Sequence, residues 1–522
     1  MNTTTTIDAQ DVSYTAPYTG AVTATQSELN QWTSLNVLNF MTETQRADIL
    51  NNVGSIDCTA AFQAAINALP VQGGIIELPS GTIFMTTVQI NRGYLYIRGN
   101  PKGTRIIDSS TTADLFQIGD GSTKVSGVRF ENLSIWASST KTAGTVFNCN
   151  QLESFQFVNV CVGSNDDYVA NGNVNRLWNG YIFNRFAQGL VFGGEIVCAN
   201  YPVQANGNVD QSFGAELVFD GGLDIQYSTK NNAVLLGGGT GGVYFGRVNI
   251  SSCAGGIWWS KTLTDVNNRE AFVSDLCTID SCPSRAISVA SDSLETLDLK
   301  GWISACGNDK SNPLLSSIWV DITTATPPVA CEINASGLRV QDSLFDGVQV
   351  SSGTLNWVGG LLRSNGTGIN GGHGLVFGAG RLNLSGVQVY NNGNSTRGYG
   401  LLINGAISYT VIGNNFFSNG QGSINNDNVG FSTTGLIRSN VGYVTENIGS
   451  TQILSGQTTV AVNHGLAAAP SLVLITMAGQ QDGGAYAYVA PSSYTATQFT
   501  ITYSVPAGAN RPFVWQAFMG TE

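Results

Sequence analysis

The chain has few charged residues and almost no histidine. Of its 522 residues, 11% are Asp, Glu, Lys or Arg, and only two are His. The 23 Lys and Arg are outnumbered by 35 Asp and Glu, which gives a net charge of -12. A clustered basic surface for nucleic-acid phosphates is therefore not expected. No GxSxG phrase occurs, and we expect His373 and His464 to be turn or core residues. These features disfavour a Ser-His-Asp hydrolase.

The sequence also lacks long apolar runs and an export leader. No run of about 18 apolar residues occurs, and the start "MNTTTTIDAQ" has neither a basic nor an apolar region. We therefore expect a protein that does not insert into a membrane. The nine cysteines do not form the even set of a disulfide framework, and "CTIDSC" (277 to 282) lacks metal-ligand spacing. We expect reduced, mostly buried cysteines, no metal and no organic cofactor.

Glycine and small polar residues are abundant instead, and an apolar phrase recurs among them. Gly alone accounts for 63 residues, which favours many short strands joined by turns. The phrase alternates apolar residues, bends at small residues and alternates again, and its starts are 22 to 36 residues apart. Such a period indicates a solenoid. The copies are "VRFENLSIWAS" (128), "FQFVNVCVGSN" (155), "LVFGGEIVCAN" (190), "LVFDGGLDIQYS" (217), "VYFGRVNISSC" (243), "FVSDLCTIDSC" (272), "LDLKGWISACG" (297), "INASGLRVQDS" (333), "LNWVGGLLRSNG" (355), "LNLSGVQVYNNG" (382) and "YTVIGNNFFSNG" (409).

The spacing within each copy predicts two short strands that meet at a corner. The period of two excludes a helical repeat, and a β-propeller would need four strands in a period of about 40 residues. We therefore predict an all-β protein, a right-handed parallel β-helix whose coils stack about 4.8 Å apart. Asn365, Asn392 and Asn419 each precede a Gly at the end of a copy. Their spacing predicts a ladder of stacked Asn side chains, with a structural role.

The segment from 57 to 107 resembles a known family. It contains "DCTAAFQAAINALP", then "GGIIELPSGTIF" and "LYIRG". This order resembles the start of pectate-lyase-like β-helices, in particular those of bacteriophage tailspikes. The stretch from 14 to 42 is similar to the connector that leads into tailspike β-helices, and the resemblance extends over residues 14 to 445. Ala60 to Leu69 is predicted to be a short helix that caps the solenoid.

The resemblance implies a homotrimer that binds a bacterial surface polysaccharide and cleaves it. Such a protein would be made in the host cytoplasm and would become part of the phage tail. It would act at the host cell surface. We expect a connector for another tail or baseplate protein at 1–50 and the β-helix at 51–445. After about residue 446 the repeat stops and segments of alternating apolar and polar residues follow. This pattern predicts a small β-sandwich at 446–522 for trimerisation or carbohydrate contact.

Carboxylates are the candidate catalytic groups. Glycoside hydrolysis needs two, about 5–5.5 Å apart for retention or about 6.5–9.5 Å apart for inversion, and neighbouring coils supply such spacings. Aligning the copies at 190 and 217 puts Phe192 and Phe219 inward. With one inserted residue in the glycine bend, Glu195 and Asp224 then face outward on adjacent coils. The other two candidates are Asp220, just before the bend, and Asp275, which we expect in the column of Asp220 two coils later.

Aromatic and polar residues around these acids are the candidate sugar contacts, because apolar faces of sugar rings stack on aromatic rings. Trp258 and Trp259 alternate in direction on a predicted strand, so at most one can be buried. The remaining predicted contacts are Tyr244, Arg247, Glu216 and Tyr227. Weaker or rival candidates are Trp178, Trp319, Lys261 and Arg269, Asp210 in the turn before 217, and Asp166 with Asp167 in "SNDDYVANGN".

The sequence favours an endo-acting glycosidase that depolymerises a capsular or O-antigen polysaccharide. Two alternatives stay open. A polysaccharide lyase would need a uronate substrate and a base, and a receptor-binding spike would use the same acids only to hold sugar hydroxyls.

Overall fold

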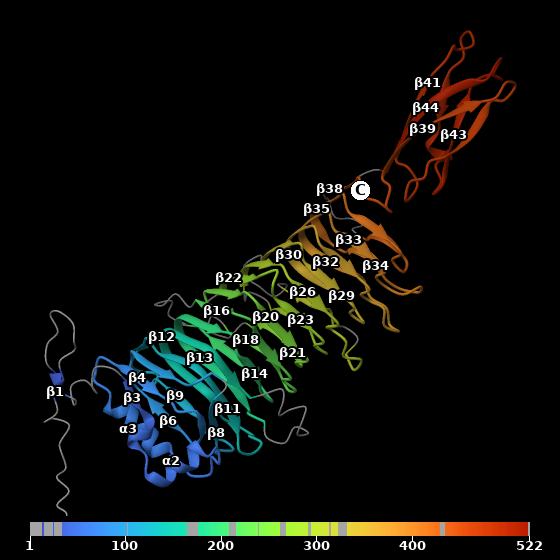
Figure 1. Cartoon of the computed structure of the whole chain (residues 1–522). Helices are drawn as coiled ribbons and strands as arrows, with labels where there is room; N and C mark the ends of the chain where they lie inside the picture. Colours follow the sequence, from blue (N-terminus) through green and yellow to red (C-terminus); the bar gives the residue numbers. More distant parts are fainter. Residues whose placement is uncertain are drawn as a thin grey trace, which may run out of the picture. The chain divides into compact units, whose positions relative to one another are not determined.

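The protein is a parallel β-helix followed by a small pair of antiparallel sheets (Figure 1). The computed structural model describes residues 13–14, 24–25, 34–101, 103–163, 176–207, 216–237, 240–260, 268–290, 294–312, 315–321, 331–427 and 434–519. The chain divides into two compact units, Met1–Leu297 and Asp298–Glu522, and each is described by itself. No helix among the described residues is long and apolar enough to cross a bilayer. The predicted all-β class is confirmed.

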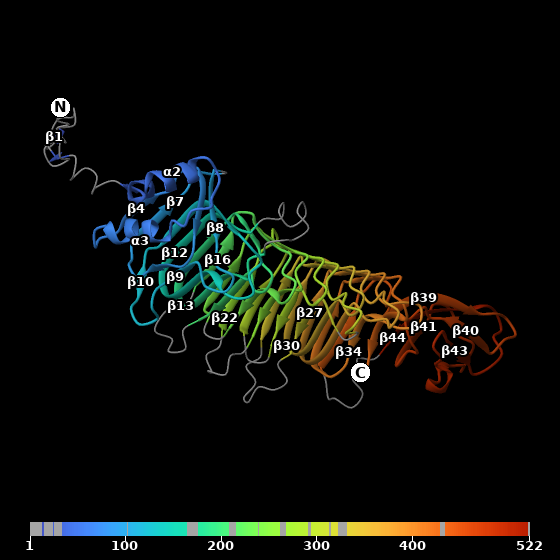
Figure 2. The same ribbon diagram turned by 90° about the horizontal axis from the view of Figure 1, so that it is seen from below.

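Short helices cover the first coil of unit 1 (Figure 2). They are η1 (Val37–Phe40), α2 (Glu43–Leu50) and α3 (Thr59–Ala68). Helix α3 confirms the predicted cap, and its side chains pair with the exposed edge of β6 (Val88–Ile90). Gln63 Nε2 donates to Gln89 O at 2.9 Å, and Gln89 N donates to Gln63 Oε1 at 2.8 Å. The edge groups are thereby paired, as a terminal coil requires. The connector predicted at 1–50 falls largely outside the described residues.

Three parallel ladders form the coils of unit 1, here named sheets A, B and C. Sheet A contains β3 (Ser34–Asn36), β4 (Gly74–Glu77), β7 (Leu95–Arg98), the first part of β11 (Arg129–Ala137), the middle of β12 (Thr145–Val162), the end of β13 (Asn179–Phe192), β16 (Leu217–Asp220), β19 (Gly242–Phe245) and β22 (Asn268–Val273). Sheet B contains β5 (Gly81–Met85), β8 (Thr104–Asp108), the ends of β11 and β12, β14 (Glu195–Val197), β17 (Leu223–Gln226), β20 (Val248–Ser251) and β23 (Thr278–Asp280). Sheet C contains β6 (Val88–Ile90), β9 (Phe116–Ile118), the starts of β12 and β13, β15 (Val203–Asn206), β18 (Asn232–Leu236), β21 (Gly255–Trp259) and β24 (Ile287–Val289). Two short pairings lie beside these ladders: β1 (Ser13–Tyr14) with β2 (Ala24–Thr25), and β10 (Val125–Ser126) with β12.

Stacked side chains fill the coil interior. Phe116, Phe147 and Tyr181 come from successive coils of sheet C and are stacked with centroids 5.2 and 5.0 Å apart. All nine cysteines are free, and eight of them are buried, as the sequence predicted. Such stacking fixes which side chain of each strand points inward, and the alternate positions face outward.

One ion pair is buried inside unit 1. Lys141 Nζ lies 2.5 Å from Asp108 Oδ2, both side chains are inaccessible to solvent, and the ammonium also donates to Ala113 O at 2.7 Å. Burial raises the pKa of Asp108, while its hydrogen bond to Lys141 opposes that rise. The pair links two coils through charges that have no access to water.

Unit 2 continues with the same kind of parallel ladders and contains the predicted Asn ladder. Asn365 Nδ2 donates to Asn392 Oδ1, and Asn392 Nδ2 donates to Asn419 Oδ1, both at 3.0 Å. The first two side chains are fully buried. The strands are β25 (Leu294–Leu299), which begins before the division, then β26 (Trp302–Ser304), β27 (Ile318–Val320), β28 (Glu332–Ser336), β29 (Arg339–Gln341), β30 (Val348–Val358), β31 (Leu361–Arg363), β32 (Leu375–Ser385), β33 (Gln388–Tyr390), β34 (Tyr399–Ile403), β35 (Ala406–Ile412), β36 (Asn415–Phe417), β37 (Gly422–Asn426) and β38 (Thr434–Arg438).

Two three-stranded antiparallel sheets end the chain, as the change of sequence pattern after residue 446 predicted. One has the order β39 (Glu446–Ile453), β44 (Arg511–Phe518), β41 (Leu472–Met477), and the other β40 (Thr459–Asn463), β43 (Gln498–Tyr503), β42 (Ala487–Val489). A short 3-10 helix, η2 (Pro491–Ser493), precedes β43. Phe499 and Trp515, one from each sheet, pack edge to face with centroids 5.4 Å apart. His464 belongs to this core: it is fully buried, and Leu466 N donates to its Nδ1.

Candidate functional site

Glu195 and Asp224 lie side by side on adjacent strands of sheet B. The register pairs Glu195 of β14 with Asp224 of β17, and both are only partly buried while Ile196 and Ile225 point into the core. The two acids therefore face outward about one coil spacing apart, about 4.8 Å between their strands. The predicted register of this pair is confirmed.

Polar neighbours extend this column in one direction. Asn249 Nδ2 donates to Asp224 Oδ1 at 2.9 Å, and Thr278 Oγ1 donates to Asn249 Oδ1 at 2.8 Å. On the other side of Glu195, the adjacent residue in the column is Cys161. Burial raises the pKa of the Cys161 thiol, which keeps it protonated and unsuited to nucleophilic attack. Glu195 and Asp224 therefore remain the candidate reactive groups of this column.

Asp220 lies on sheet A, on the other side of a glycine bend. Gly221 and Gly222 both have positive φ and carry the chain from β16 to β17. Asp220 Oδ1 accepts a hydrogen bond from Arg247 N at 2.7 Å. The carboxylate lies over Gly246, where an added Cβ would come within 2.4 Å of Oδ1. A glycine at 246 is therefore what allows Asp220 to hold this position.

An apolar stripe crosses the outer surface of sheet A. The register stacks Leu190, Val218, Tyr244 and Phe272 on successive strands, all on the outward side. Tyr244 is 38% exposed, and its ring stacks on Phe272 with centroids 5.1 Å apart and planes 2° apart. Water-facing positions rarely form a continuous apolar column without a partner, so this stripe is a candidate ligand surface.

Phe192 belongs to the same surface, which corrects its predicted inward position. It pairs with Asp220, its side chain is 40% exposed, and its ring lies over Gly221, where an added Cβ would be 2.7 Å from Cδ1. The cause is a shift of one residue between β13 and β16, because Val191 pairs with Phe219 and points inward in its place.

Two glutamates border the stripe. Glu216 precedes β16 and Glu270 lies on β22, and both are exposed. The residue between them in the column is Gly242 of β19, so no side chain separates the two carboxylates. Sequence reasoning named Glu216 but missed Glu270, Phe272 and Phe192. In "EAFVSD" the small Ala271 and Val273 point inward, and the larger Phe272 points outward.

The structure contradicts the predicted placement of Asp275. The register pairs Phe245 with Val273, so Ser274 follows Gly246 in the column of Asp220. Asp275 lies one residue further along, exposed in the turn between β22 and β23. The bend of this coil has the same length as the bend after Asp220, because four residues separate Ser274 from Thr278 as they separate Asp220 from Asp224, and Asp275 therefore corresponds to Gly221.

The two tryptophans do not join the acids. Trp259 is fully buried, which contradicts its predicted role as a sugar contact, and its Nε1 has no hydrogen-bond partner among the residues that the structure describes. Trp258 points outward and is half-buried, but β21 belongs to sheet C rather than to sheets A and B. Tyr227 follows β17 at the end away from the glycine bend. These residues therefore lie apart from the group formed by Glu195, Asp220 and Asp224.

Other candidates lie outside this surface or outside the described residues. Trp178 follows the undescribed stretch before β13 and lies under Lys230, whose Nζ is 5.7 Å from the indole centroid. Trp319 is on β27 of unit 2. His373, also in unit 2, is structural: Tyr399 N donates to its Nδ1 at 3.0 Å. The candidates Asp166, Asp167, Asp210 and Lys261 fall outside the described residues, as does the side chain of Arg269.

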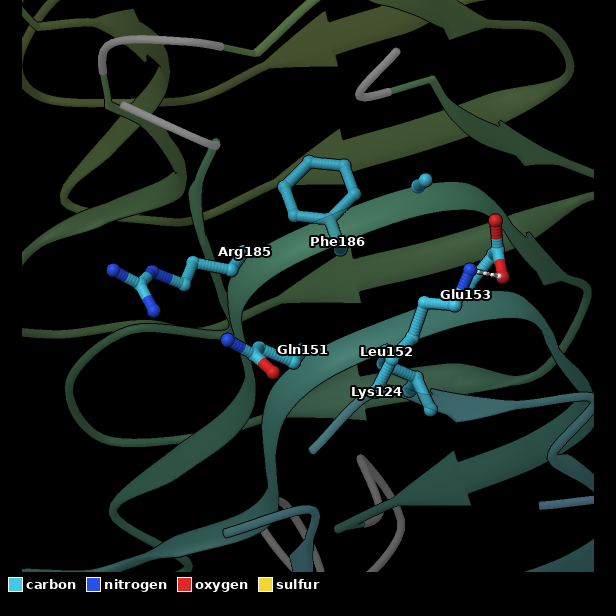
Figure 3. A pocket seen from close by; sticks show the side chains of 7 residues that line it. Lys124, Gln151, Leu152, Glu153, Arg185 and Phe186 are labelled. Atoms are coloured by element: carbon cyan, nitrogen blue, oxygen red, sulfur yellow. Dashed lines mark ion pairs between the residues drawn. The ribbon is translucent and has the colours of Figure 1, made fainter. Parts of the chain in front are cut away.

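A small pocket lies at the bend between sheets C and A. Its lining includes the Lys124–Glu153 ion pair, 2.6 Å long, on one side and Gln151 and Arg185 on the other, with Phe186 between them (Figure 3). It encloses about 170 Å³ of empty space, part of it open solvent. No predicted catalytic residue lines it, and the exposed surface of sheets A and B is the better candidate site.

Comparisons with known proteins agree with this fold. No protein-family model matches the chain, and no curated protein matches it. Among solved structures, a doubly substituted tailspike protein of E. coli bacteriophage HK620 matches with a TM-score of 0.50 at 12% identity, over 98% of both chains. The Dettilon tailspike protein matches with a TM-score of 0.41 at 12% identity, over 94% of this chain and 95% of that one. The A-module of the Azotobacter vinelandii mannuronan C-5 epimerase AlgE6 matches with a TM-score of 0.36 at 12% identity, over 78% and 98%.

The likeness to the HK620 tailspike establishes the fold. At this identity it does not carry catalytic residues from one chain to the other, so the site must be argued from its own geometry.

Proposed function

We propose that this protein is a bacteriophage tailspike that binds a bacterial surface polysaccharide and cleaves it by endo-glycosidic hydrolysis. The observation that carries the proposal is a pair of outward carboxylates, Glu195 and Asp224, beside a surface stripe of apolar and aromatic side chains. Aromatic faces bind sugar rings and paired carboxylates hydrolyse the bonds between them. The fold shared with the HK620 tailspike and the resemblance of residues 14 to 445 to tailspikes support this function.

The two carboxylates are assigned complementary roles. Asp224 is held by Asn249 and acts as the nucleophile or base, while Glu195 acts as the acid that protonates the leaving oxygen. Adjacent strands place them about 4.8 Å apart at the backbone, which brings both carboxyl groups within reach of one glycosidic bond. Asp220 is held by the Arg247 amide across the bend and completes the acidic group.

The experiment replaces these acids one at a time. Glu195→Gln, Asp224→Asn and Asp220→Asn are incubated with purified polysaccharides from a panel of hosts, and the products are sized and assayed for reducing ends. For Glu195 and Asp224 we expect cleavage to fall by about a hundredfold or more, because each removes a proton-transfer or nucleophilic group. Glu332→Gln is the matched control, since Glu332 is an exposed outward acid on β28 in unit 2.

The products separate this proposal from its alternatives. New reducing ends without an unsaturated, ultraviolet-absorbing product identify hydrolysis, and an unsaturated product identifies a lyase. Binding without any change in polymer length identifies a non-cleaving receptor-binding spike. Full activity in all three acid variants would remove the site assignment while leaving the function open.

The assembly is part of the same proposal. We infer a homotrimer that is attached to another tail or baseplate protein through residues 1–50, with residues 446–522 serving trimerisation or carbohydrate contact. The virion tail is the proposed location, and the host surface is where it acts. Sedimentation of the full chain and of a chain that ends at residue 445 tests whether the C-terminal sheets hold the subunits together.

A further inference from the structure

Tyr244 stands on the surface of sheet A between two glycines, Gly242, which is exposed, and Gly246, which the Asp220 carboxylate covers. The outward positions next to it on its own strand are Gly242 and Gly246, because alternate residues of a strand share a face. One side of its ring plane is turned toward Phe272, with which it is stacked. Its other side is turned toward Val218 of the preceding coil, a shorter side chain that is partly exposed. The ring therefore offers one face to a ligand.

The structure requires a glycine at position 246 but not at position 242. An added Cβ at Gly246 would collide with Asp220, so a glycine is required there. Among the described residues, an added Cβ at Gly242 would meet only Glu216 Cγ, 3.9 Å away, and Gly242 is not among the residues with positive φ. Glycine weakens the interior of a strand, and neither backbone nor packing requires it at this position. The absence of a side chain at Gly242 leaves the backbone of β19 exposed at that position.

The apolar stripe is not a requirement of the fold. In unit 2 the outward column on β28, β30, β32 and β35 is made of Asn334, Asn356, Asn383 and Thr410. Their side chains are joined by hydrogen bonds of 3.0 Å from Asn356 to Asn334 and 2.7 Å from Asn383 to Asn356. An outward column of a coil can thus be wholly polar, so the coil itself does not require the apolar stripe around Tyr244.

The charge around Tyr244 defines what can bind. Carboxylates of Glu216, Asp220 and Glu270 occupy outward positions on β22 and beside or on β16. Among the side chains of β16, β19 and β22 that the structure describes, none is Lys or Arg, and the exposed Arg247 follows Gly246 in the bend. Glu216 and Asp220 flank Val218, and all three share one face. Ionised carboxylates accept hydrogen bonds from hydroxyl and amide groups, and they repel other anions.

We propose that Tyr244, Val218, Glu216 and Asp220 form a subsite for an uncharged pyranose ring. The ring stacks on the free face of Tyr244 above Val218, and the two carboxylates accept hydrogen bonds from its hydroxyl or N-acetyl groups. Gly242 leaves room beside it for the next residue of the polymer. This inference rests on the proposed function, that the surface binds polysaccharide, and it names the substrate class: at this subsite the polymer carries no uronate, sialate or phosphate.

The test measures binding to an immobilised panel of purified bacterial O-antigen and capsular polysaccharides of known composition, with and without acidic groups. The wild-type chain is expected to bind members without acidic groups. Tyr244→Ala is expected to weaken that binding about tenfold or more, while Tyr244→Phe keeps the stacking surface and most of the affinity. Gly242→Leu fills the open position and is expected to abolish binding without lowering the melting temperature.

A matched control is available in unit 2. Tyr390 and Phe417 form another stacked pair, with centroids 4.4 Å apart and Phe417 43% exposed, but Arg363 is the neighbour of Tyr390 in that column. Phe417→Ala should bind as the wild type does. Binding restricted to acidic polymers, no binding to any uncharged member, or unchanged binding in both Tyr244→Ala and Gly242→Leu would overturn the subsite.

The outcomes for the subsite and for hydrolysis are separable. Loss of binding in Tyr244→Ala and Gly242→Leu, with no cleavage by the wild type, supports the subsite and contradicts hydrolysis. Cleavage by the wild type that persists in both variants supports hydrolysis and contradicts the subsite.

Discussion

Removing one rung of the buried Asn ladder should open the coils of unit 2 locally. Asn392 is fully buried, and its Oδ1 accepts hydrogen bonds from Asn365 N at 3.2 Å and Asn365 Nδ2 at 3.0 Å. Its Nδ2 donates to Leu362 O at 2.9 Å and to Asn419 Oδ1 at 3.0 Å. Asn392→Ala leaves the backbone N–H of Asn365 without its acceptor, which costs about 1–3 kcal/mol, and the other lost hydrogen bonds add about 1 kcal/mol each. We expect a total near 4 kcal/mol.

Hydrogen exchange is the appropriate assay, because a solenoid opens in local units rather than all at once. Since about 1.4 kcal/mol corresponds to a factor of ten, amides around residues 362–419 should exchange at least a hundredfold faster in Asn392→Ala. Asn383→Ala is the control: Asn383 is exposed, donates to Asn356 at 2.7 Å, and should change protection by about 0.5 kcal/mol or less. Equal effects of the two substitutions would refute the argument that burial gives the ladder its importance.

Three further predictions follow from buried or crowded polar groups. Lys141→Met leaves the Asp108 carboxylate buried without its cation and should cost about 3–5 kcal/mol in urea unfolding, most of it recovered when Asp108 is also replaced by Leu. Burial lowers the pKa of His373, so its stabilising contribution should be present above about pH 6.5 and be lost as the pH falls below that value. Amide exchange in unit 2 at pH 7.5 and 5.5 checks this. His373→Gln should remove the part of the pH dependence that His373 contributes and leave that of the neighbouring Asp346, whose pKa burial raises. Gly246→Ala brings a Cβ to 2.4 Å from Asp220 Oδ1, and displacement of that carboxylate should lower cleavage about tenfold or more, without further loss when combined with Asp220→Asn.

The sequence predicted the inward half of this fold well because stacking constrains it. Apolar alternation with a period near one coil indicated the β-helix, and Asn392 with its neighbours indicated the ladder, since both depend on identical side chains being repeated from coil to coil. The capping helix was also predictable, because a terminal coil must cover its edge and the run at α3 is amphipathic. The β-helix, the Asn ladder and the capping helix all follow from the stacking of coils and the covering of the terminal edge.

The outward positions of the coils depend on the length and phase of each bend, and a single sequence defines these poorly. An inserted residue in this bend was predicted from the cost of burying Glu195, on an alignment of Phe192 with Phe219. In the structure Phe192 pairs with Asp220 instead, and one extra residue after Asp220 brings Asp224 beside Glu195. No such argument applied to Asp275, where Ser274 took the expected position, or to Phe192, whose apolar side chain suggested an inward position.

The difference between inward and outward positions explains where function can reside in such a protein. Inward positions are fixed by stacking, so a residue that departs from the pattern there destabilises the coil. Outward positions are free of that constraint, and an outward residue that the fold does not need is therefore evidence of a ligand. Gly242 is the sharpest case, because a glycine weakens the strand and leaves an exposed aromatic ring accessible beside three carboxylates. If filling that position with Leu leaves both stability and binding unchanged, the connection between unexplained outward residues and function fails for this protein.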